Sequence, residues 1–165
     1  MGIIGKHIIP KINPEHSFPL LFSYSVGMLS ALILFTSLDY ILPVRSAAAI
    51  VLLTLLVSAA HISSLPAAVV MPILTAVVGF ASASLSVRIV DVSAFSERVR
   101  CLMFLLISVP FQFVVGAVGL DCSKALKAAL SASGKNDLIF RQFFCGLVFF
   151  LLSLPIASAI VIYIL

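Results

Sequence analysis

The chain has 165 residues, of which 62% are hydrophobic and only 10% charged, and its formal net charge is +4. Soluble domains carry about 25% charged residues, so this composition excludes a globule covered by water. The positive residues form no dense Lys/Arg tract and no basic stripe with interleaved aromatics, which argues against nucleic-acid binding. We therefore expect an integral membrane protein that contacts the lipid bilayer and no nucleic acid.

Residues 1–17 are a polar N-terminal segment, and the first apolar run follows at 18–42. That run is longer than the roughly 7–15 apolar residues of a secretory signal peptide. It is long enough to cross a bilayer, which takes about 20 apolar residues. We predict that it is retained as the first membrane-spanning helix of a single membrane domain covering 1–165.

The second and third apolar runs, 46–63 and 65–87, meet at the letters SSLP, residues 63–66. Together they are too long to form one helix across a hydrocarbon core of about 30 Å, because each helical residue adds about 1.5 Å. The residue before a proline is also disfavoured in helical geometry. We therefore predict a tight hairpin at Ser63–Pro66, with one helix on each side.

Two charged connecting segments, 88–100 and 121–134, flank the fourth apolar run at 101–120. Each segment carries its apolar residues on one helical stripe, so we predict two short amphipathic helices that lie at the membrane interface. The fifth apolar run covers 142–165. The predicted fold class is all-α, a polytopic helical membrane protein with four to five transmembrane helices.

The distribution of Lys and Arg bears on orientation, because cytoplasmic loops carry more of them. Five crossings with the N-terminus inside give six on the inner side and four on the outer side. Alternatively, 101–120 dips into the membrane and returns, and an outer N-terminus then gives eight inside against two outside. We favour five crossings, because an uncharged run of this length usually crosses. The inner group is then Lys6, Lys11, Lys124, Lys127, Lys135 and Arg141, and the outer group is Arg45, Arg88, Arg98 and Arg100.

Three polar residues near or inside the runs are candidates for chemistry. Asp39 lies near the end of the first run, so we interpret it with Arg45 as a membrane boundary; a proton or substrate role for Asp39 is the alternative. His61 has no second histidine in the spans to complete a haem site, and we interpret it as an interfacial or helix-contact residue. Gln112 is the deepest strongly polar residue, which favours a helix-to-helix hydrogen bond over ligand binding.

The sequence contains no recognisable catalytic, metal-binding or cofactor-binding motif. Its three cysteines, Cys101, Cys122 and Cys145, have no close spacing, and their odd number argues against a disulfide framework or a zinc site. Catalysis needs several positioned polar groups, and no apolar run holds a pair of carboxylates. We therefore predict no catalytic residue, no cofactor, no metal and no enzyme activity.

Small residues recur at every fourth position in parts of the first and third runs. This spacing puts small side chains on one helix face and lets helix backbones approach closely. The contact is made either within this chain or with a partner. The predicted packing residues are Ser23, Gly27 and Ala31 in the first run, and Thr75, Gly79 and Ala83 in the third.

These features favour a non-catalytic integral membrane subunit of a larger multi-subunit assembly, which contributes helix packing or scaffolding. Its expected partners are other membrane protein subunits, and anionic lipid headgroups near Lys124 and Lys127. The alternative is a small transporter or channel protomer that oligomerises to form a path lined by Gln112, Ser108 and His61. An intramembrane enzyme ranks below both.

We expect the protein to reside in a bacterial cytoplasmic (inner) membrane. The connections between the predicted spans are short, and the sequence shows no targeting peptide. An organelle membrane is the alternative location.

Overall fold

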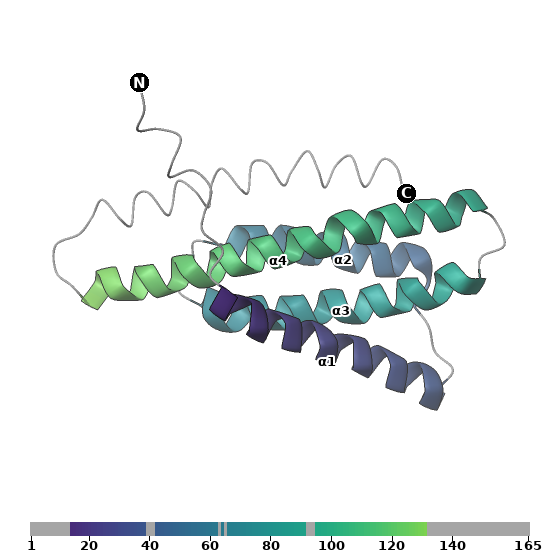
Figure 1. Cartoon of the computed structure of the whole chain (residues 1–165), viewed down its shortest axis with the longest axis horizontal. Helices are drawn as coiled ribbons and strands as arrows, with labels where there is room; N and C mark the ends of the chain where they lie inside the picture. The colour runs from purple at the N-terminus through teal and green to yellow at the C-terminus, as the bar shows by residue number, and fades with distance from the viewer. Residues whose placement is uncertain (1–13, 39–41, 63, 65, 92–94, 132–165) are drawn as a thin grey trace, which may run out of the picture.

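The computed structural model describes residues 14–38, 42–62, 64, 66–91 and 95–131, and these residues form α-helices without any strand (Figure 1). The helices are α1 (Pro14–Leu38), α2 (Val44–His61), α3 (Ala67–Asp91) and α4 (Phe95–Ser131). All four are long and apolar enough to cross a membrane. The predicted class is confirmed: the chain is a helical integral membrane protein. The fifth apolar run, 142–165, lies outside the described residues.

The hairpin predicted at Ser63–Pro66 is confirmed, because α2 ends at His61 and α3 begins at Ala67. The carbonyl of His61 accepts hydrogen bonds from the Ser64 N–H at 3.0 Å and from the Ser64 hydroxyl at 2.8 Å. The carbonyl of Pro66 then accepts the Val70 N–H at 2.9 Å, which is the first bond of α3. The two helix ends therefore satisfy backbone groups locally, as a turn at a membrane boundary requires.

α3 is the central helix of the described bundle. α1, α2 and α4 each pack against it, and α4 also contacts α1 and α2, whereas α1 and α2 do not meet in the described ranges. The five consecutive residues at 81–85 are all buried, so α3 is covered on every side there. α1 is the most peripheral helix: 17% of its most apolar stretch is buried, against 50% in α3.

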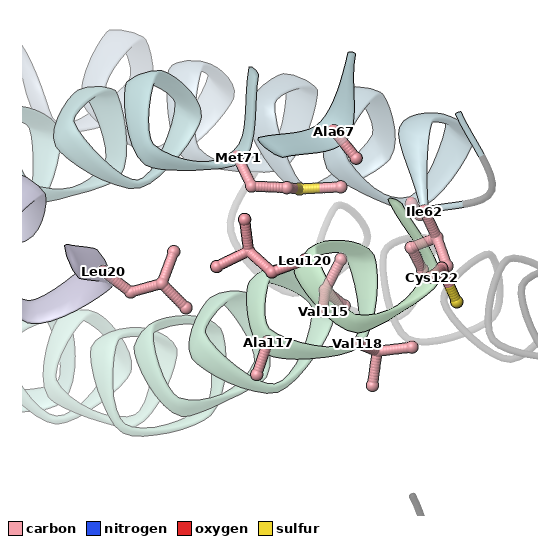
Figure 2. Close-up of a cluster of buried hydrophobic side chains, with 10 residues drawn as sticks. Leu20, Ile62, Ala67, Met71, Val115, Ala117, Val118, Leu120 and Cys122 are labelled. Carbon is pink, nitrogen blue, oxygen red and sulfur yellow. The ribbon is translucent and has the colours of Figure 1, made fainter. Parts of the chain in front are cut away.

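Two clusters of buried hydrophobic side chains hold the helices together. Figure 2 shows the first cluster, in which side chains from all four described helices meet near the hairpin between α2 and α3. Its members are Leu20, Ala59, Ile62, Ala67, Met71, Val115, Ala117, Val118, Leu120 and Cys122. The second cluster joins α2, α3 and α4, and comprises Ala47, Ala48, Val51, Leu52, Leu55, Val78, Ala81, Leu85 and Phe104.

The structure differs from the sequence prediction in the fourth helix. α4 runs unbroken from Phe95 to Ser131, and it includes 95–100 of the first connecting segment and 121–131 of the second, while 88–91 continue α3. Separate interfacial helices at 88–100 and 121–134 were therefore a wrong prediction, and so was the re-entrant alternative for 101–120. A change from apolar to charged residues does not end a helix, and Pro110 is accommodated inside α4. At about 1.5 Å per residue the helix is about 55 Å long, so it extends beyond the hydrocarbon core.

The direction of the helices separates the described basic residues into two groups. α1 and α3 run one way, and α2 and α4 run the other way (Figure 1). Arg45 at the start of α2 and Arg88 near the end of α3 therefore share one end with Arg98 and Arg100 at the start of α4. Lys124 and Lys127 lie near the other end of α4. The five-crossing arrangement requires these four arginines on one side of the membrane and these two lysines on the other. The helix directions agree with that requirement.

Candidate functional site

The two predicted stripes of small residues contact each other across α1 and α3. A Cβ atom added at Gly27 would overlap the carbonyl oxygen of Ala76 and would lie 3.0 Å from the backbone nitrogen of Phe80. A Cβ atom added at Gly79 would overlap the carbonyl oxygen of Tyr24 and would lie 3.2 Å from its Cα atom. We call this pair of close approaches the glycine contact. Only glycine fits at either position, because the opposing atoms belong to backbone and cannot rotate away.

The remaining stripe residues extend the same side of each helix. Ala31, Thr75 and Ala83 are buried, and Ser23 is half-buried. α1 and α3 are parallel (Figure 1), and the glycine contact brings the turn around Gly27 beside the turn around Gly79. The sequence spacing identified each stripe but did not show whether it contacts another helix of this chain or a partner protein. In the structure, Gly27 and Gly79 form a contact within the chain, whereas the Thr75 hydroxyl accepts a hydrogen bond from Gln112 on α4.

α1 also touches α4 near its N-terminal half. The rings of Tyr24 and Phe113 have centroids 5.5 Å apart and planes tilted by 55°, a separation at which aromatic rings attract each other. A Cβ atom added at Gly116 would lie 3.1 Å from both terminal carbons of Leu20. The C-terminal end of α1 lies farther from α3 than its N-terminal end does (Figure 1). α1 is therefore held by one face and mainly by one half of its length.

Gln112 links α3 to α4 inside the bundle. Its side chain is fully buried, and its Nε2 atom donates to Thr75 Oγ1 at 3.2 Å. The Thr75 hydroxyl in turn donates to the carbonyl of Met71 at 2.8 Å. The helix-to-helix hydrogen bond expected of Gln112 is thus present, and its partner is one of the predicted packing residues. The amide oxygen of Gln112, Oε1, has no hydrogen-bond partner within the described part of the chain.

His61 is the last residue of α2 and lies half-exposed at the hairpin. Its Nδ1 atom lies 2.8 Å from the carbonyl oxygen of Val57, one turn earlier in the helix. A carbonyl only accepts, so Nδ1 carries the ring proton in this bond. The described ranges contain no group of three His, Cys, Asp or Glu side chains that could hold a metal ion. This arrangement ties His61 to its own helix end.

Two other predictions from the sequence can be located only in part. Asp39 lies outside the described residues, so its relation to Arg45, which is exposed, stays a prediction. Cys101 and Cys122 are both buried, and Cys145 lies outside the described residues.

Sequence reasoning missed a set of buried polar atoms. Most described Ser and Thr hydroxyls that form hydrogen bonds donate to the carbonyl one turn back, as Ser30, Thr54 and Ser86 do. Other polar atoms are buried without a hydrogen-bond partner in the described ranges: Ser58 Oγ, Ser82 Oγ, Ser108 Oγ, Arg88 Nε and Gln112 Oε1. A helical repeat of seven residues from Thr75 would have pointed to Ser82. Nothing in the sequence distinguishes Ser58 from other span serines.

No protein-family model, no curated protein and no solved structure matches the chain. Its function is therefore inferred from two features of the described residues. One is the glycine contact between α1 and α3, and the other is the set of buried polar residues between α3 and α4.

Proposed function

We propose that the chain is a non-catalytic integral membrane subunit that contributes packed helices to a larger membrane assembly. The observation that carries the proposal is the position of α1, which is attached through one narrow face. Its outer face is wide and apolar: Leu29 is 58% exposed and Ile33 is 62% exposed. Helices in lipid associate through van der Waals packing and interhelical hydrogen bonds, so this face suits a helix of another membrane protein subunit.

A polar side chain on the outer face of α1 is compatible with such a partner. Ser30 is exposed, and its hydroxyl is already bonded to the carbonyl of Val26 at 2.8 Å. The outer face of α1 is therefore an apolar surface on which the Ser30 hydroxyl needs no further hydrogen-bond partner. This favours packing of a helix over binding of a polar solute at α1.

The proposal is tested by extracting the protein from its native membrane in mild detergent and measuring the mass of the particle. We expect a complex larger than the chain alone, with other membrane subunits identified by mass spectrometry of the same peak. The isolated chain should unfold at a lower temperature in detergent than the chain co-expressed with its partners. A monodisperse monomer that moves a solute when reconstituted alone would overturn the proposal.

The placement of the polar residues weighs against the alternative of a path formed between copies. Such a path would be lined by Gln112, Ser108 and His61. Gln112 and Ser108 are each 0% exposed inside a single chain, so neither could face a neighbouring copy without rearrangement of α3 and α4. Only His61 is accessible to a second copy.

For location, our proposal is a bacterial cytoplasmic membrane with the Lys124 and Lys127 end of α4 inside, next to anionic headgroups. The short connection between α2 and α3 supports a compact protein of this kind, and the count of Lys and Arg over the sequence favours this orientation. The test introduces single cysteines by Lys127→Cys and Arg98→Cys, both at exposed positions. An impermeant thiol reagent added to intact cells should label the second and spare the first; the reverse pattern would overturn the orientation.

A further inference from the structure

Three oxygen atoms carried by α3 and α4 are buried without a hydrogen-bond partner in the described chain. They are Gln112 Oε1, Ser108 Oγ and Ser82 Oγ, and the three residues are 0%, 0% and 2% exposed. An unpaired polar atom is costly in an apolar interior, and lipid cannot satisfy it. Most buried polar atoms in proteins are paired with protein groups or with ordered water. These three atoms therefore point to a bound polar species.

Two contacts fix how α3 and α4 are aligned. Gln112 donates to Thr75, and a Cβ atom added at Gly119 would lie 2.6 Å from Met71 Cε. The helices are antiparallel (Figure 1), so residues after Thr75 on α3 face residues before Gln112 on α4. Ser82 and Ser108 therefore lie at nearly the same level, and Ser108 is one turn, or about 6 Å, from Gln112 along α4. We call these facing residues the polar interface: Thr75, Ser82, Ser108 and Gln112.

The two serines of the polar interface differ from other hydroxyls of the bundle. Thr54 donates to the carbonyl of Ile50 at 2.6 Å, and Ser84 donates to the carbonyl of Phe80 at 3.2 Å. Bonding to the preceding turn is the usual way in which a membrane helix satisfies a hydroxyl. Ser82 and Ser108 make no such bond. Both hydroxyls can therefore donate a hydrogen bond to a bound molecule and accept one from it.

We infer that the polar interface binds ordered water between α3 and α4. A buried water needs 2–4 polar partners, and here it donates to Gln112 Oε1 and forms hydrogen bonds with the hydroxyls of Ser108 and Ser82. A cation is disfavoured, because the stretches 67–87 and 101–120 contain no Asp or Glu to balance its charge. This site is independent of the proposed subunit role.

The direct test is water-edited solid-state NMR on the full chain in lipid bilayers. Magnetisation should pass from water protons to the side chains of Gln112, Ser82 and Ser108 severalfold faster than to Thr54. Thr54 is the matched control, because it is buried and its hydroxyl is bonded within its own helix. Val78, which is fully buried in an apolar cluster, sets the baseline. Transfer to the polar interface that is no faster than transfer to Thr54 would overturn the inference.

A second test uses the sign of a stability change. In a dry site, Ser108→Ala or Ser82→Ala removes an unpaired buried hydroxyl, and the midpoint of thermal unfolding in detergent should stay constant or rise. In a hydrated site, each variant removes a hydroxyl that is hydrogen-bonded to the bound water. The midpoint of thermal unfolding should then fall by about 2–4 °C. The control Thr54→Val should change it little. A constant or raised midpoint in both serine variants would contradict the inference.

Discussion

α3 packs against α1 and against α4 through different physical contacts. On the α1 side, Gly27 and Gly79 allow backbone to approach backbone. On the α4 side, the side chains of Thr75 and Gln112 form a hydrogen bond, and the Met71 side chain reaches Gly119. The first contact depends on the absence of side-chain atoms, and the second depends on their presence.

This difference matters because the bilayer offers little hydrophobic driving force between helices. Close backbone packing and interhelical hydrogen bonds are the two remaining sources of attraction, and α3 uses one on each side. Enlarging a residue should therefore break the glycine contact, whereas deleting a polar group should weaken the polar interface.

The largest effect is expected for Gly27→Leu. The added side chain would overlap the backbone of Ala76 and Phe80, so α1 must move away from α3. Overpacking of this kind typically costs about 1–3 kcal/mol, and the upper end is expected because backbone cannot rotate aside. The measurement is reversible unfolding in mixed micelles, followed by circular dichroism.

Leu34→Ile is the matched control for Gly27→Leu. Leu34 lies on the same helix and is 37% exposed, so the exchange should leave stability unchanged within about 0.5 kcal/mol. Both variants retain a hydropathic span and should insert into the membrane normally. A Gly27→Leu protein as stable as the parent would show that α1 does not depend on the glycine contact.

A smaller loss is expected for Gly79→Ala, which approaches the same contact from α3. One methyl group would overlap the carbonyl oxygen of Tyr24, and the shift of α1 that relieves the overlap should cost about 2 kcal/mol. Alanine favours helix over glycine by up to about 1 kcal/mol, which offsets part of this loss. The informative measurement is the distance between spin labels on α1 and α3, which should increase. An unchanged distance with raised stability would mean that Gly79 is dispensable.

Much of this fold was predictable from hydropathy and proline positions. The first three helices and the hairpin before Ala67 follow from apolar runs and from Pro66. The extent of α4 was not predictable in the same way, because hydropathy marks the end of an apolar run at the first charged residues and does not mark the end of the helix. Charged residues end a membrane span without ending a helix, and α4 continues into both charged segments.

The candidate site was predictable in its components and not in its pairing. Spacing identified Gly27, Gly79 and Gln112, but which helices meet depends on the register and crossing of whole helices. Its spacing from Thr75 points to Ser82, but spacing does not show that the Ser82 hydroxyl lacks a hydrogen-bond partner. The difference appears only when the acceptor of each hydroxyl is known: Ser86 donates to the carbonyl of Ser82, while the Ser82 hydroxyl has no partner in the described chain.

The hydrogen bond of the polar interface should be weaker than the glycine contact. A double-mutant cycle with Gln112→Met and Thr75→Val isolates its energy from the effects of each change alone. We expect a coupling energy of about 0.6–1.7 kcal/mol, between the average and the maximum found for hydrogen bonds between membrane helices. The same Gln112→Met change combined with Gly79→Ala should be more nearly additive. Zero coupling between Gln112 and Thr75 would mean that their contact contributes no net stability.

The smallest effect on stability is expected on the outer face of α1, and it tests the subunit proposal directly. Leu29→Ala combined with Ile33→Ala removes apolar atoms from exposed positions, so unfolding of the isolated chain should change by less than about 0.5 kcal/mol per site. Co-purification with partner subunits should nevertheless fall, because a partner helix would lose van der Waals contacts along that stripe. The control is Val69→Ala on α3, which is also exposed and lies on a different helix. If the α1 double variant and the control recover partners equally well, α1 faces lipid and the assembly surface lies elsewhere.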